Sequence, residues 1–576
     1  MKKLLKYLSE YKLESILGPL FKLLEASFEL LVPLVMARVI DIGIKNHDQH
    51  YILSMGGLLV LLGIIGLACS ITAQYFAAKA AAGFGTSLRN DLFAHINSLS
   101  YQEIDTVGTA TLITRMTSDV NQVQSGVNLF LRLFLRSPFV VFGAMIMAFT
   151  IDFKAALIFV VSIPVLSVVV FGIMIISMPL YKKVQKQLDR VLLTARENLG
   201  GVRVIRAFNR QNDEVRRFDE ENGLLVKFQV FVGKISALMN PLTYVIINLA
   251  IIVLINTGAN RVELGIITQG QVVALVNYMS QILVELVKLA NLIITISKAL
   301  ACANRISSVF SMEPGIRETN HDSVKEEADV PKVEFDKVSL FYQGAKAESL
   351  AGIEFQVMKG ETIGIIGGTG SGKTTLVNLI PRFYDVSKGT VKVGGVDVRN
   401  YSLSQLRNMV GIVPQRAVLF KGSIRENMQW GKRDASDEEI YRALTIAQAK
   451  DFVVEKGEGL DFIIEAGGKN LSGGQRQRLT IARAVVKDPQ ILILDDSASA
   501  LDFATDARLR KAIKEETKDM TVFLVSQRAS TIRNADRIVV LDDGQMAGCG
   551  KHGELMETCE VYREICLSQL SEKEVQ

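Results

Sequence analysis

Residues 363 to 375 read IGIIGGTGSGKTT, an apolar run that passes into a glycine-rich loop. Gly367, Gly372, Lys373 and Thr374 fit the pattern G-x-x-x-x-G-K-[ST]. In this pattern backbone N–H groups wrap phosphates, the lysine reaches the outer phosphates and the hydroxyl binds Mg²⁺. The apolar TIGIIG before the loop and LVNLI after it predict the strand and helix that the pattern requires. We therefore predict a phosphate-binding loop made of Gly367, Gly368, Thr369, Gly370, Ser371, Gly372, Lys373, Thr374 and Thr375.

The sequence around this loop predicts an α/β domain. From Lys332 onward, short apolar runs alternate with helical patterns, which favours a largely parallel sheet. A second apolar run, in ILILDDSASALD at residues 491 to 502, ends in two adjacent aspartates. In P-loop NTPases such a strand carries an aspartate that helps to hold Mg²⁺, and Asp495 fits that role.

The stretch LSGGQRQR, residues 471 to 478, lies just upstream of that run. The phosphate-binding loop, LSGGQ and the strand aspartate, in this order, resemble an ABC-type ATPase. In that family two ATPase domains close face to face, and each ATP is covered by the loop of one domain and the LSGGQ of the other. The resemblance implies that the helix N-terminus at Ser472, Gly473, Gly474 and Gln475 offers N–H donors to the γ-phosphate of the ATP held by a partner domain. A chain with one such domain therefore has to dimerise.

The resemblance also implies roles for other residues. Tyr342, in VSLFYQG, would stack on adenine, although an ordinary edge-strand tyrosine fits the sequence as well. Gln415, in GIVPQRAVLF, would sense the γ-phosphate and join Thr374 and Asp495 around Mg²⁺. Residues 499 to 502, SALD, would couple the two ATP sites.

Two positions depart from the family pattern. The strand aspartate is usually followed by a glutamate that orients or deprotonates the attacking water. Here Asp496 follows it, and its carboxylate is set back by about one C–C bond, ~1.5 Å. Where the family usually has a histidine at the γ-phosphate, VFLVSQRAS has Gln527, which can form a hydrogen bond but cannot carry the charge of an imidazolium. Altered hydrolytic positions beside intact binding residues resemble the degenerate-site subunit of a heterodimeric exporter, whose partner supplies the glutamate and the histidine.

The composition changes ahead of the ATPase-like domain. With 576 residues the chain is too long for one domain, and its 49% hydrophobic content indicates one very apolar part. Its mean hydropathy is +0.26. The charged stretch at 311–331 predicts a linker between a membrane domain at 1–310 and an ATPase domain at 332–576. A net charge of +5 gives no basic field for nucleic acid, and the five cysteines lack ligand-like spacing. The N-terminus lacks the pattern of a removable signal peptide.

Six segments of the first part are long enough to cross ~30 Å of hydrocarbon as helices. They lie near residues 16–40, 52–77, 129–151, 155–178, 235–257 and 271–295. The long connections near 78–128 and 179–234 carry most of the lysines and arginines, so we expect them, and both termini, in the cytoplasm. Their helical spacing and few prolines predict helices that continue beyond the bilayer.

Six membrane segments ahead of an ABC-type ATPase domain make the chain similar to a half-transporter with the exporter-type fold, located in the cytoplasmic membrane. GTATLITRMTSDV, residues 108 to 120, and ENLGGVRVIRAF, residues 197 to 208, resemble the two cytoplasmic turns that press on the ATPase domains. Ordinary surface turns fit these two stretches equally well.

Charged residues lie inside two of the predicted spans, namely Lys22, Glu25, Glu29, Glu285 and Lys288. Their spacing of three and four places each set on one helix face. Charges at membrane depth are costly and mark a polar path or cavity, whereas self-neutralising pairs that only orient helices explain them equally well. The spare acid of the first set favours a cavity for polar or cationic cargo. Arg132 and Arg136, near the cytoplasmic end of the third span, are explained by snorkelling.

Three functions fit these features. The first is a heterodimeric exporter that uses ATP and Mg²⁺, acts on amphipathic drugs or lipid-like molecules, and contains this chain as the subunit with the slow site. The second is an ATP-gated regulatory or channel-like membrane protein, and the third is a homodimeric exporter that tolerates Asp496. We expect export rather than uptake, and the membrane segments exclude a soluble ABC ATPase.

Overall fold

The computed structural model describes residues 2–316, 330–342, 344–517 and 519–569. The chain forms two compact units. One comprises Met1–Asn97 and Ala110–Met312, and the other comprises Ser98–Thr109 and Glu313–Gln576. Of the predicted linker, residues 317–329 lie outside the described part of the chain.

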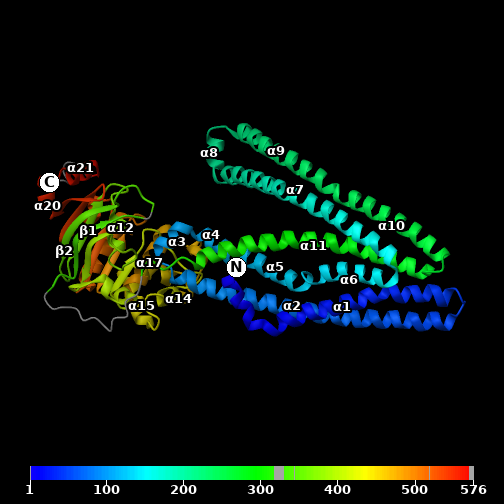
Figure 1. The fold of residues 1–576 in the computed structure, drawn as a ribbon. Helices are drawn as coiled ribbons and strands as arrows, with labels where there is room; N and C mark the ends of the chain where they lie inside the picture. Colours follow the sequence, from blue (N-terminus) through cyan, green and yellow to red (C-terminus); the bar gives the residue numbers. More distant parts are fainter. Residues whose placement is uncertain (1, 317–329, 343, 518, 570–576) are drawn as a thin grey trace. The chain divides into compact units, whose positions relative to one another are not determined.

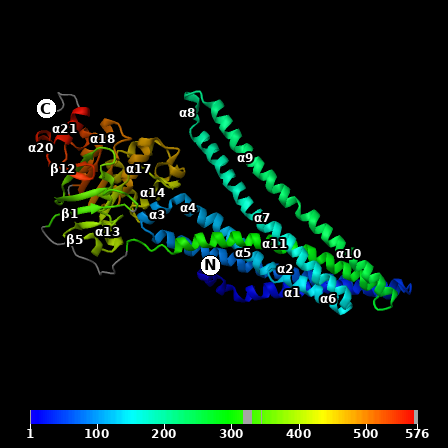
Figure 2. The ribbon, with the colours of Figure 1, turned by 45° about the horizontal axis from the view of Figure 1, so that its top comes forward.

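The first unit consists of helices. Its longer helices are α1 (Lys12–Arg38), α2 (Gln49–Ser98), α5 (Val120–Leu133), α6 (Arg136–Ile151), α7 (Phe153–Gly200), α9 (Gln211–Ala237), α10 (Met239–Glu263) and α11 (Gln269–Phe310). Short segments join them: η1 (Lys2–Tyr11), η2 (Val39–Ile44), α4 (Thr109–Thr114), η3 (Arg115–Asp119) and α8 (Val202–Ala207). In Figures 1 and 2, α7 and α9 run side by side and α8 joins them at one end. At 1.5 Å per residue the 50-residue α2 is about 75 Å long, which confirms that this helix extends beyond a bilayer thickness.

Five helices of the described chain are long and apolar enough to cross a membrane. They are Gln49–Ser98, Thr109–Ile151, Phe153–Gly200, Gln211–Glu263 and Gln269–Phe310, and they contain five of the six predicted spans. The predicted span at 16–40 is the exception. The 27-residue α1 covers most of it as one helix, but Lys22, Glu25 and Glu29 place three charges in its apolar stretch, whereas the apolar stretches of the other five hold at most two.

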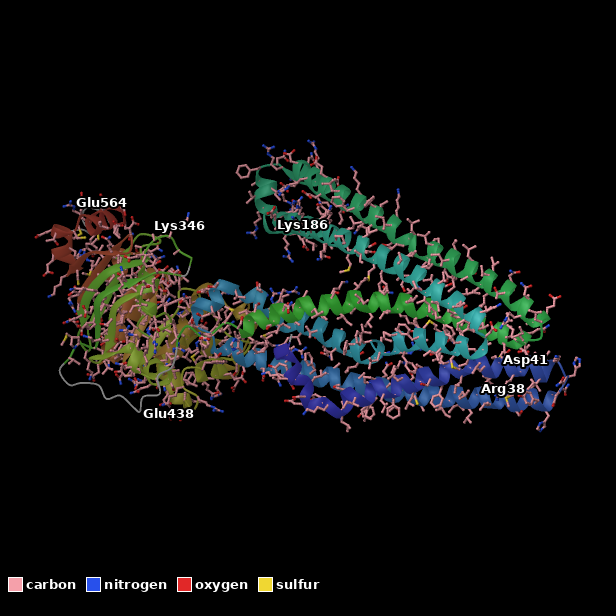
Figure 3. The ribbon with its side chains drawn as sticks, viewed as in Figure 1. Arg38, Asp41, Lys186, Lys346, Glu438 and Glu564 are labelled. Carbon is pink, nitrogen blue, oxygen red and sulfur yellow. The ribbon has the colours of Figure 1, made fainter. Side chains whose placement is uncertain are left out.

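The connections between the apolar helices are held by acidic side chains. Asp152 caps α7 by accepting a hydrogen bond from the backbone N–H of Ala155 at 2.8 Å, and it pairs with Arg261 near the end of α10. Asp41 accepts one from the backbone N–H of Gly270 at 2.8 Å. In Figure 3, Asp41 lies at one end of this helical unit, whereas Lys186 of α7 lies toward the other.

The second unit contains a six-stranded sheet in the order β12 (Gln545–Gly550), β11 (Arg537–Asp542), β3 (Thr362–Gly367), β10 (Thr521–Val525), β9 (Ile491–Asp495) and β6 (Val410–Val413). All neighbours in it are parallel except β11 and β12, so the prediction of a largely parallel sheet is confirmed. A separate antiparallel sheet has the order β2 (Leu350–Val357), β1 (Val333–Leu340), β4 (Lys388–Val393) and β5 (Val396–Asp397) and was not predicted. The burial of β2 alternates along the strand, as in a sheet with one covered face. A two-stranded sheet pairs β7 (Gly422–Ser423) with β8 (Ile463–Ile464).

Helices surround these sheets. They are α3 (Tyr101–Val107), α12 (Lys373–Asn378), η4 (Val398–Asn400), α13 (Leu403–Met409), α14 (Ile424–Gln429), α15 (Asp437–Ile446), α16 (Lys450–Glu455), η5 (Gly459–Asp461), η6 (Ala466–Gly468), α17 (Gly473–Val485), α18 (Phe503–Glu516), α19 (Ala529–Ile532), α20 (His552–Thr558) and α21 (Glu560–Gln569). Alternate residues of β9 belong to different hydrophobic clusters: Ile491 and Ile493 to one, Leu492 and Leu494 to the other. The strand is therefore buried on both faces, which explains its unbroken apolar run. Its carboxyl end carries Asp495 to the same sheet edge as the end of β3.

Candidate nucleotide site

The loop between β3 and α12 depends on glycine at positions where a side chain does not fit. A Cβ at Gly367 would lie 2.1 Å from the carbonyl oxygen of Leu541. Gly372 has a φ of +92°, and a Cβ there would lie 2.8 Å from the carbonyl oxygen of Ser349. Gly370 has a φ of +86° and faces open space, which leaves room for a ligand against the backbone.

Lys373 is buried beneath this loop. Its Nζ donates hydrogen bonds to the carbonyl oxygens of Gly367 at 3.0 Å and Gly368 at 2.6 Å. Burial lowers the pKa of the Lys373 ammonium below its usual range, and the neighbouring Asp496 and Asp495 carboxylates oppose that shift. A buried ammonium beside an open backbone loop is a suitable site for phosphate oxygens.

Thr374 and Asp495 place oxygen atoms side by side. The Thr374 hydroxyl donates to Asp495, with Oγ1 lying 2.9 Å from Oδ2 and 3.1 Å from Oδ1. Burial raises the pKa of the Asp495 carboxyl, the Thr374 hydrogen bond lowers it and the Asp496 charge raises it further. A hydroxyl and a carboxylate are the hard oxygen donors that Mg²⁺ prefers, so these residues fit a magnesium ion shared with phosphate.

Asp496 lies immediately after β9 with a φ of +46°, in the left-handed region. Its backbone N–H donates to the carbonyl oxygen of Val525 at 2.9 Å, which fixes the turn. Its side chain reaches Gln415, whose Nε2 donates to Oδ2 at 3.3 Å. The backbone carbonyl of Gln527 accepts a hydrogen bond from the side chain of Gln569 at 2.8 Å.

One cavity of about 820 Å³ brings most of the predicted residues together. Its lining includes Tyr342, Thr369, Gly370, Gly372, Lys373, Thr374, Thr375, Gln415, Asp495, Asp496 and Gln527. The volume lies in the range of small-molecule sites. The open loop, the buried ammonium and the paired oxygens fit ATP with Mg²⁺.

The LSGGQ segment lies apart from this cavity. Ser472 caps α17: its hydroxyl accepts from the backbone N–H of Gln475 at 3.2 Å, and the Gln475 side chain accepts from its backbone N–H at 3.0 Å. None of Ser472, Gly473, Gly474 and Gln475 is among the described residues that line the cavity. The phosphate-binding loop and the LSGGQ segment at the start of α17 therefore lie at separate places in the chain.

An aromatic cluster beside the cavity was not predicted. The Tyr342 hydroxyl lies 3.0 Å from Thr375 Oγ1, and its ring meets Tyr384 edge to face with centroids 5.2 Å apart. The Tyr384 hydroxyl donates to Asp105 of α3 at 2.8 Å, and Tyr101 of α3 lies 4.7 Å from the Phe383 ring. The signal in the sequence that could have indicated this cluster is the pair of adjacent aromatic residues in RFYDV, residues 382 to 386.

The predicted turn at residues 108 to 120 only partly coincides with the segment that is grouped with the ATPase unit. The segment that belongs to the ATPase unit is Ser98–Thr109, which overlaps the predicted turn only at Gly108 and Thr109. Gly108, with a φ of +81°, ends α3, and the residues from Ala110 onward return to the helical unit. The second predicted turn, 197 to 208, contains α8, in which no residue is buried.

The predicted charges of the helical unit form ion pairs. Lys22 pairs with Glu25 at 2.5 Å and Lys288 pairs with Glu285 at 2.9 Å. The snorkelling interpretation of Arg136 is wrong. Its side chain is buried, and its guanidinium binds Glu285 at 2.5 Å and Glu29 at 2.6 Å. The reason is that Glu29 of α1 and Glu285 of α11 hold the guanidinium between the helices, inside the bundle rather than at its rim.

The chain is similar to known transporters over its full length. The profile described as ABC transporter transmembrane region matches residues 15–286, and the one described as ABC transporter matches residues 350–499. A putative multidrug export ATP-binding/permease protein of Bacillus subtilis (strain 168) is 32% identical over 98% of this chain and 98% of its own length. An ATP-dependent lipid A-core flippase of Desulfotalea psychrophila is 34% identical over 81% of this chain and 82% of its own. The solved structure of a bacterial Atm1-family ABC exporter with ATP bound shares the fold, with a TM-score of 0.80 at 23% identity over 98% of this chain and 99% of that one.

Proposed function

The chain belongs to the ABC transporter family as an ATP-hydrolysing half-transporter with the exporter fold, and on this basis we propose that it forms one half of a heterodimeric exporter. In this proposal its own site binds ATP and Mg²⁺ but hydrolyses ATP slowly. Lys373 holds the phosphates, and Thr374, Asp495 and Gln415 surround the metal. A different half-transporter supplies the efficient site, which this chain's LSGGQ completes.

The observation that carries the proposal is the geometry at Asp496. Its short side chain extends to Gln415, with 3.3 Å between Nε2 and Oδ2, in the same cavity as Gln527. A carboxylate set back by ~1.5 Å loses a water held at hydrogen-bond distance, and a positioned general base contributes about 10²- to 10⁴-fold in rate. The groups that hold phosphate and metal are complete, so binding without fast turnover follows.

The proposal includes a location in the membrane with six spans, namely α1 and the five apolar helices. It places the N-terminus and the ATPase domain in the cytoplasm. The distribution of basic residues supports this orientation, because lysines and arginines gather in the polar segment 179–234, which contains the end of α7, α8 and most of α9. For the cargo we propose amphipathic molecules, either drugs or lipids. The descriptions of the two relatives, as a putative multidrug exporter and a lipid A-core flippase, support this class.

Two substitutions in the assembled transporter test the proposal. Asp496→Asn should change steady-state ATP hydrolysis less than about twofold, because this site contributes little turnover. Replacing the glutamate after the partner's strand aspartate with glutamine should lower hydrolysis about 10²-fold or more. As a control, Lys373→Met should remove ATP retention by this chain, measured with radiolabelled ATP after rapid gel filtration.

Two outcomes contradict the proposal. One is a loss of turnover from Asp496→Asn alone. The other is hydrolysis at the full rate of the assembled transporter by this chain purified without a partner as a homodimer.

A further inference from the structure

Four charged side chains of the helical unit form a chain of alternating sign. Glu29 of α1 binds Arg136 of α6 at 2.6 Å, and Arg136 binds Glu285 of α11 at 2.5 Å. Lys288, one turn further along α11, binds the same Oε1 atom of Glu285 at 2.9 Å. The four charges sum to zero and connect three helices.

The centre and the ends of this chain differ in exposure. The side chains of Arg136 and Glu285 are 7% and 4% exposed, whereas those of Glu29 and Lys288 are 44% and 45% exposed. Ser137 donates a further hydrogen bond to Glu285 at 2.9 Å. The buried pair therefore acts as a fixed centre, and one carboxylate and one ammonium remain available for other contacts.

The two available ends line the same cavity. This cavity, of about 420 Å³, is lined by Glu29, Glu285 and Lys288 and by the apolar residues Val32 and Met36. Gln281 also lines it. The Gln281 Oε1 atom is buried and accepts no hydrogen bond within the described part of the chain. A buried acceptor without a donor is costly, so it indicates a missing N–H or O–H group.

We infer that this cavity binds the zwitterionic head of an amphipathic molecule, which specifies the cargo class of the proposed exporter and rests on that function. The carboxylate of Glu29 and Oε1 of Gln281 accept from the ammonium of the head. Lys288 donates to its phosphate or carboxylate, and the apolar wall contacts the adjoining hydrocarbon. A head with only one sign of charge would satisfy one end and meet a like charge at the other, which gives the selectivity.

Three probes with the same C12 chain test this inference: lauroyl lysophosphatidylethanolamine, dodecylammonium and lauroyl lysophosphatidic acid. Their binding is measured on the full-length chain in dodecyl maltoside micelles, which carry no charge and therefore neither attract the cation nor repel the anion. The zwitterion should bind about tenfold more tightly than either of the other probes. Equal affinity for the three probes, or tighter binding of the cation or the anion, overturns the inference.

Variants of the two ends provide a second measurement. Lys288→Met should weaken the zwitterion and the anion but not the cation, and Glu29→Gln should weaken the zwitterion and the cation but not the anion. Lys288→Arg keeps the charge and should preserve zwitterion binding, which separates a lost contact from a misfolded bundle. Lys298→Met, an exposed position on the same helix outside the cavity lining, is the matched control and should change none of the three affinities.

The outcome is separable from that of the proposed function. Selective zwitterion binding together with equal hydrolysis at the two ATP sites would support the inference but contradict the proposed heterodimer. Unequal hydrolysis without zwitterion selectivity would remove only the inference.

Discussion

Asp496 combines a short side chain with a backbone that few residues adopt. A φ of +46° is strained for most residues with a side chain, and aspartate tolerates it better than glutamate because its carboxylate can bond nearby backbone and side-chain groups. The turn is fixed by the hydrogen bond from its N–H to Val525 and by the Ser499 hydroxyl, which donates to its carbonyl at 2.9 Å. The residue is thus fixed in its turn, and in the proposed function its carboxylate lies short of the position that a catalytic base requires.

Lengthening this side chain should increase hydrolysis. We predict that Asp496→Glu combined with Gln527→His raises the turnover of this site about 10- to 100-fold, since it restores a base and a charge-bearing ring beside the γ-phosphate. The measurement is ATP hydrolysis by the assembled transporter with the partner's glutamate replaced by glutamine, so that only this site turns over. Asp496→Asn with Gln527→His is the control and should stay slow. An unchanged rate in the lengthened variant would mean that side-chain reach does not limit this site.

At the scale of elements, α3 is attached to the ATPase unit by a small set of contacts. Tyr384 donates its hydroxyl to Asp105 at 2.8 Å, and the same ring meets Tyr342, the residue predicted to stack on adenine. Burial, the hydrogen bond to Asp105 and its charge all raise the pKa of the Tyr384 phenol. The hydroxyl therefore stays protonated as a donor across the physiological range. A movement of Tyr342 on nucleotide binding has a direct path to α3 through one ring.

Removing this hydrogen bond should reduce coupling more than hydrolysis. We predict that Tyr384→Phe lowers cargo transport per ATP hydrolysed about fivefold, the equivalent of ~1 kcal/mol for one hydrogen bond, because the ring contacts remain while α3 loses its anchor. Transport and hydrolysis are measured together in proteoliposomes. Asp105→Ala should have a similar effect, because alanine cannot accept the hydrogen bond, and the double variant should be no worse than either single one. Additive losses would show that the two groups act independently.

Helices α20 and α21 are joined by a histidine that predicts a pH effect. His552 Nδ1 lies 2.7 Å from the Tyr562 hydroxyl. Burial lowers the pKa of His552, with a smaller contribution from Arg533. As the pH falls below about 6.5, the unfolded chain takes up a proton before the folded chain does, so the free energy of unfolding decreases.

The corresponding measurement is the thermal unfolding midpoint at pH 7.5 and 5.5. We predict that the unfolding midpoint of the unmodified chain falls further between these two pH values than the midpoint of His552→Asn, because asparagine at position 552 does not titrate. Equal decreases in the two proteins would contradict the prediction.

Features set by neighbouring residues were predictable from the sequence, and features set by packing were not. The phosphate-binding loop, the strand before it and the strand that ends at Asp495 depend on local pattern, and the structure brings all three to one sheet edge. The burial of Arg136 depends on ion pairs with Glu29 and Glu285 of two other helices, and the role of Tyr384 depends on contact with Asp105, 279 positions away in sequence. Neither arrangement leaves a periodic signal in the sequence.

At the scale of the whole molecule, the phosphate-binding loop and LSGGQ lie at separate places in the chain. In the proposed dimer, a substitution in the loop therefore affects one ATP site and a substitution in LSGGQ affects the other. Lys373 lines the cavity and Gly474 is not among the described residues that line it. In the proposed dimer, Lys373 therefore acts on the ATP of this chain and Gly474 on the ATP of the partner. A Cβ at Gly474 would lie 3.2 Å from the carbonyl oxygen of Ala500, so a larger side chain there also crowds the start of α17.

This division predicts opposite sensitivities in the assembled transporter. Gly474→Asp should lower steady-state hydrolysis about 10²-fold or more, because it places a negative charge beside the γ-phosphate of the efficient site, where developing negative charge has to be stabilised. Lys373→Met should lower hydrolysis only a few-fold, since it empties the slow site. ATP hydrolysis by the two purified variants, each assembled with the unmodified partner, gives the comparison. Complete loss of hydrolysis in both variants would contradict this prediction. It would mean that the site holding Lys373 and the site completed by Gly474 are both required for turnover, and therefore that the two ATP sites are equivalent.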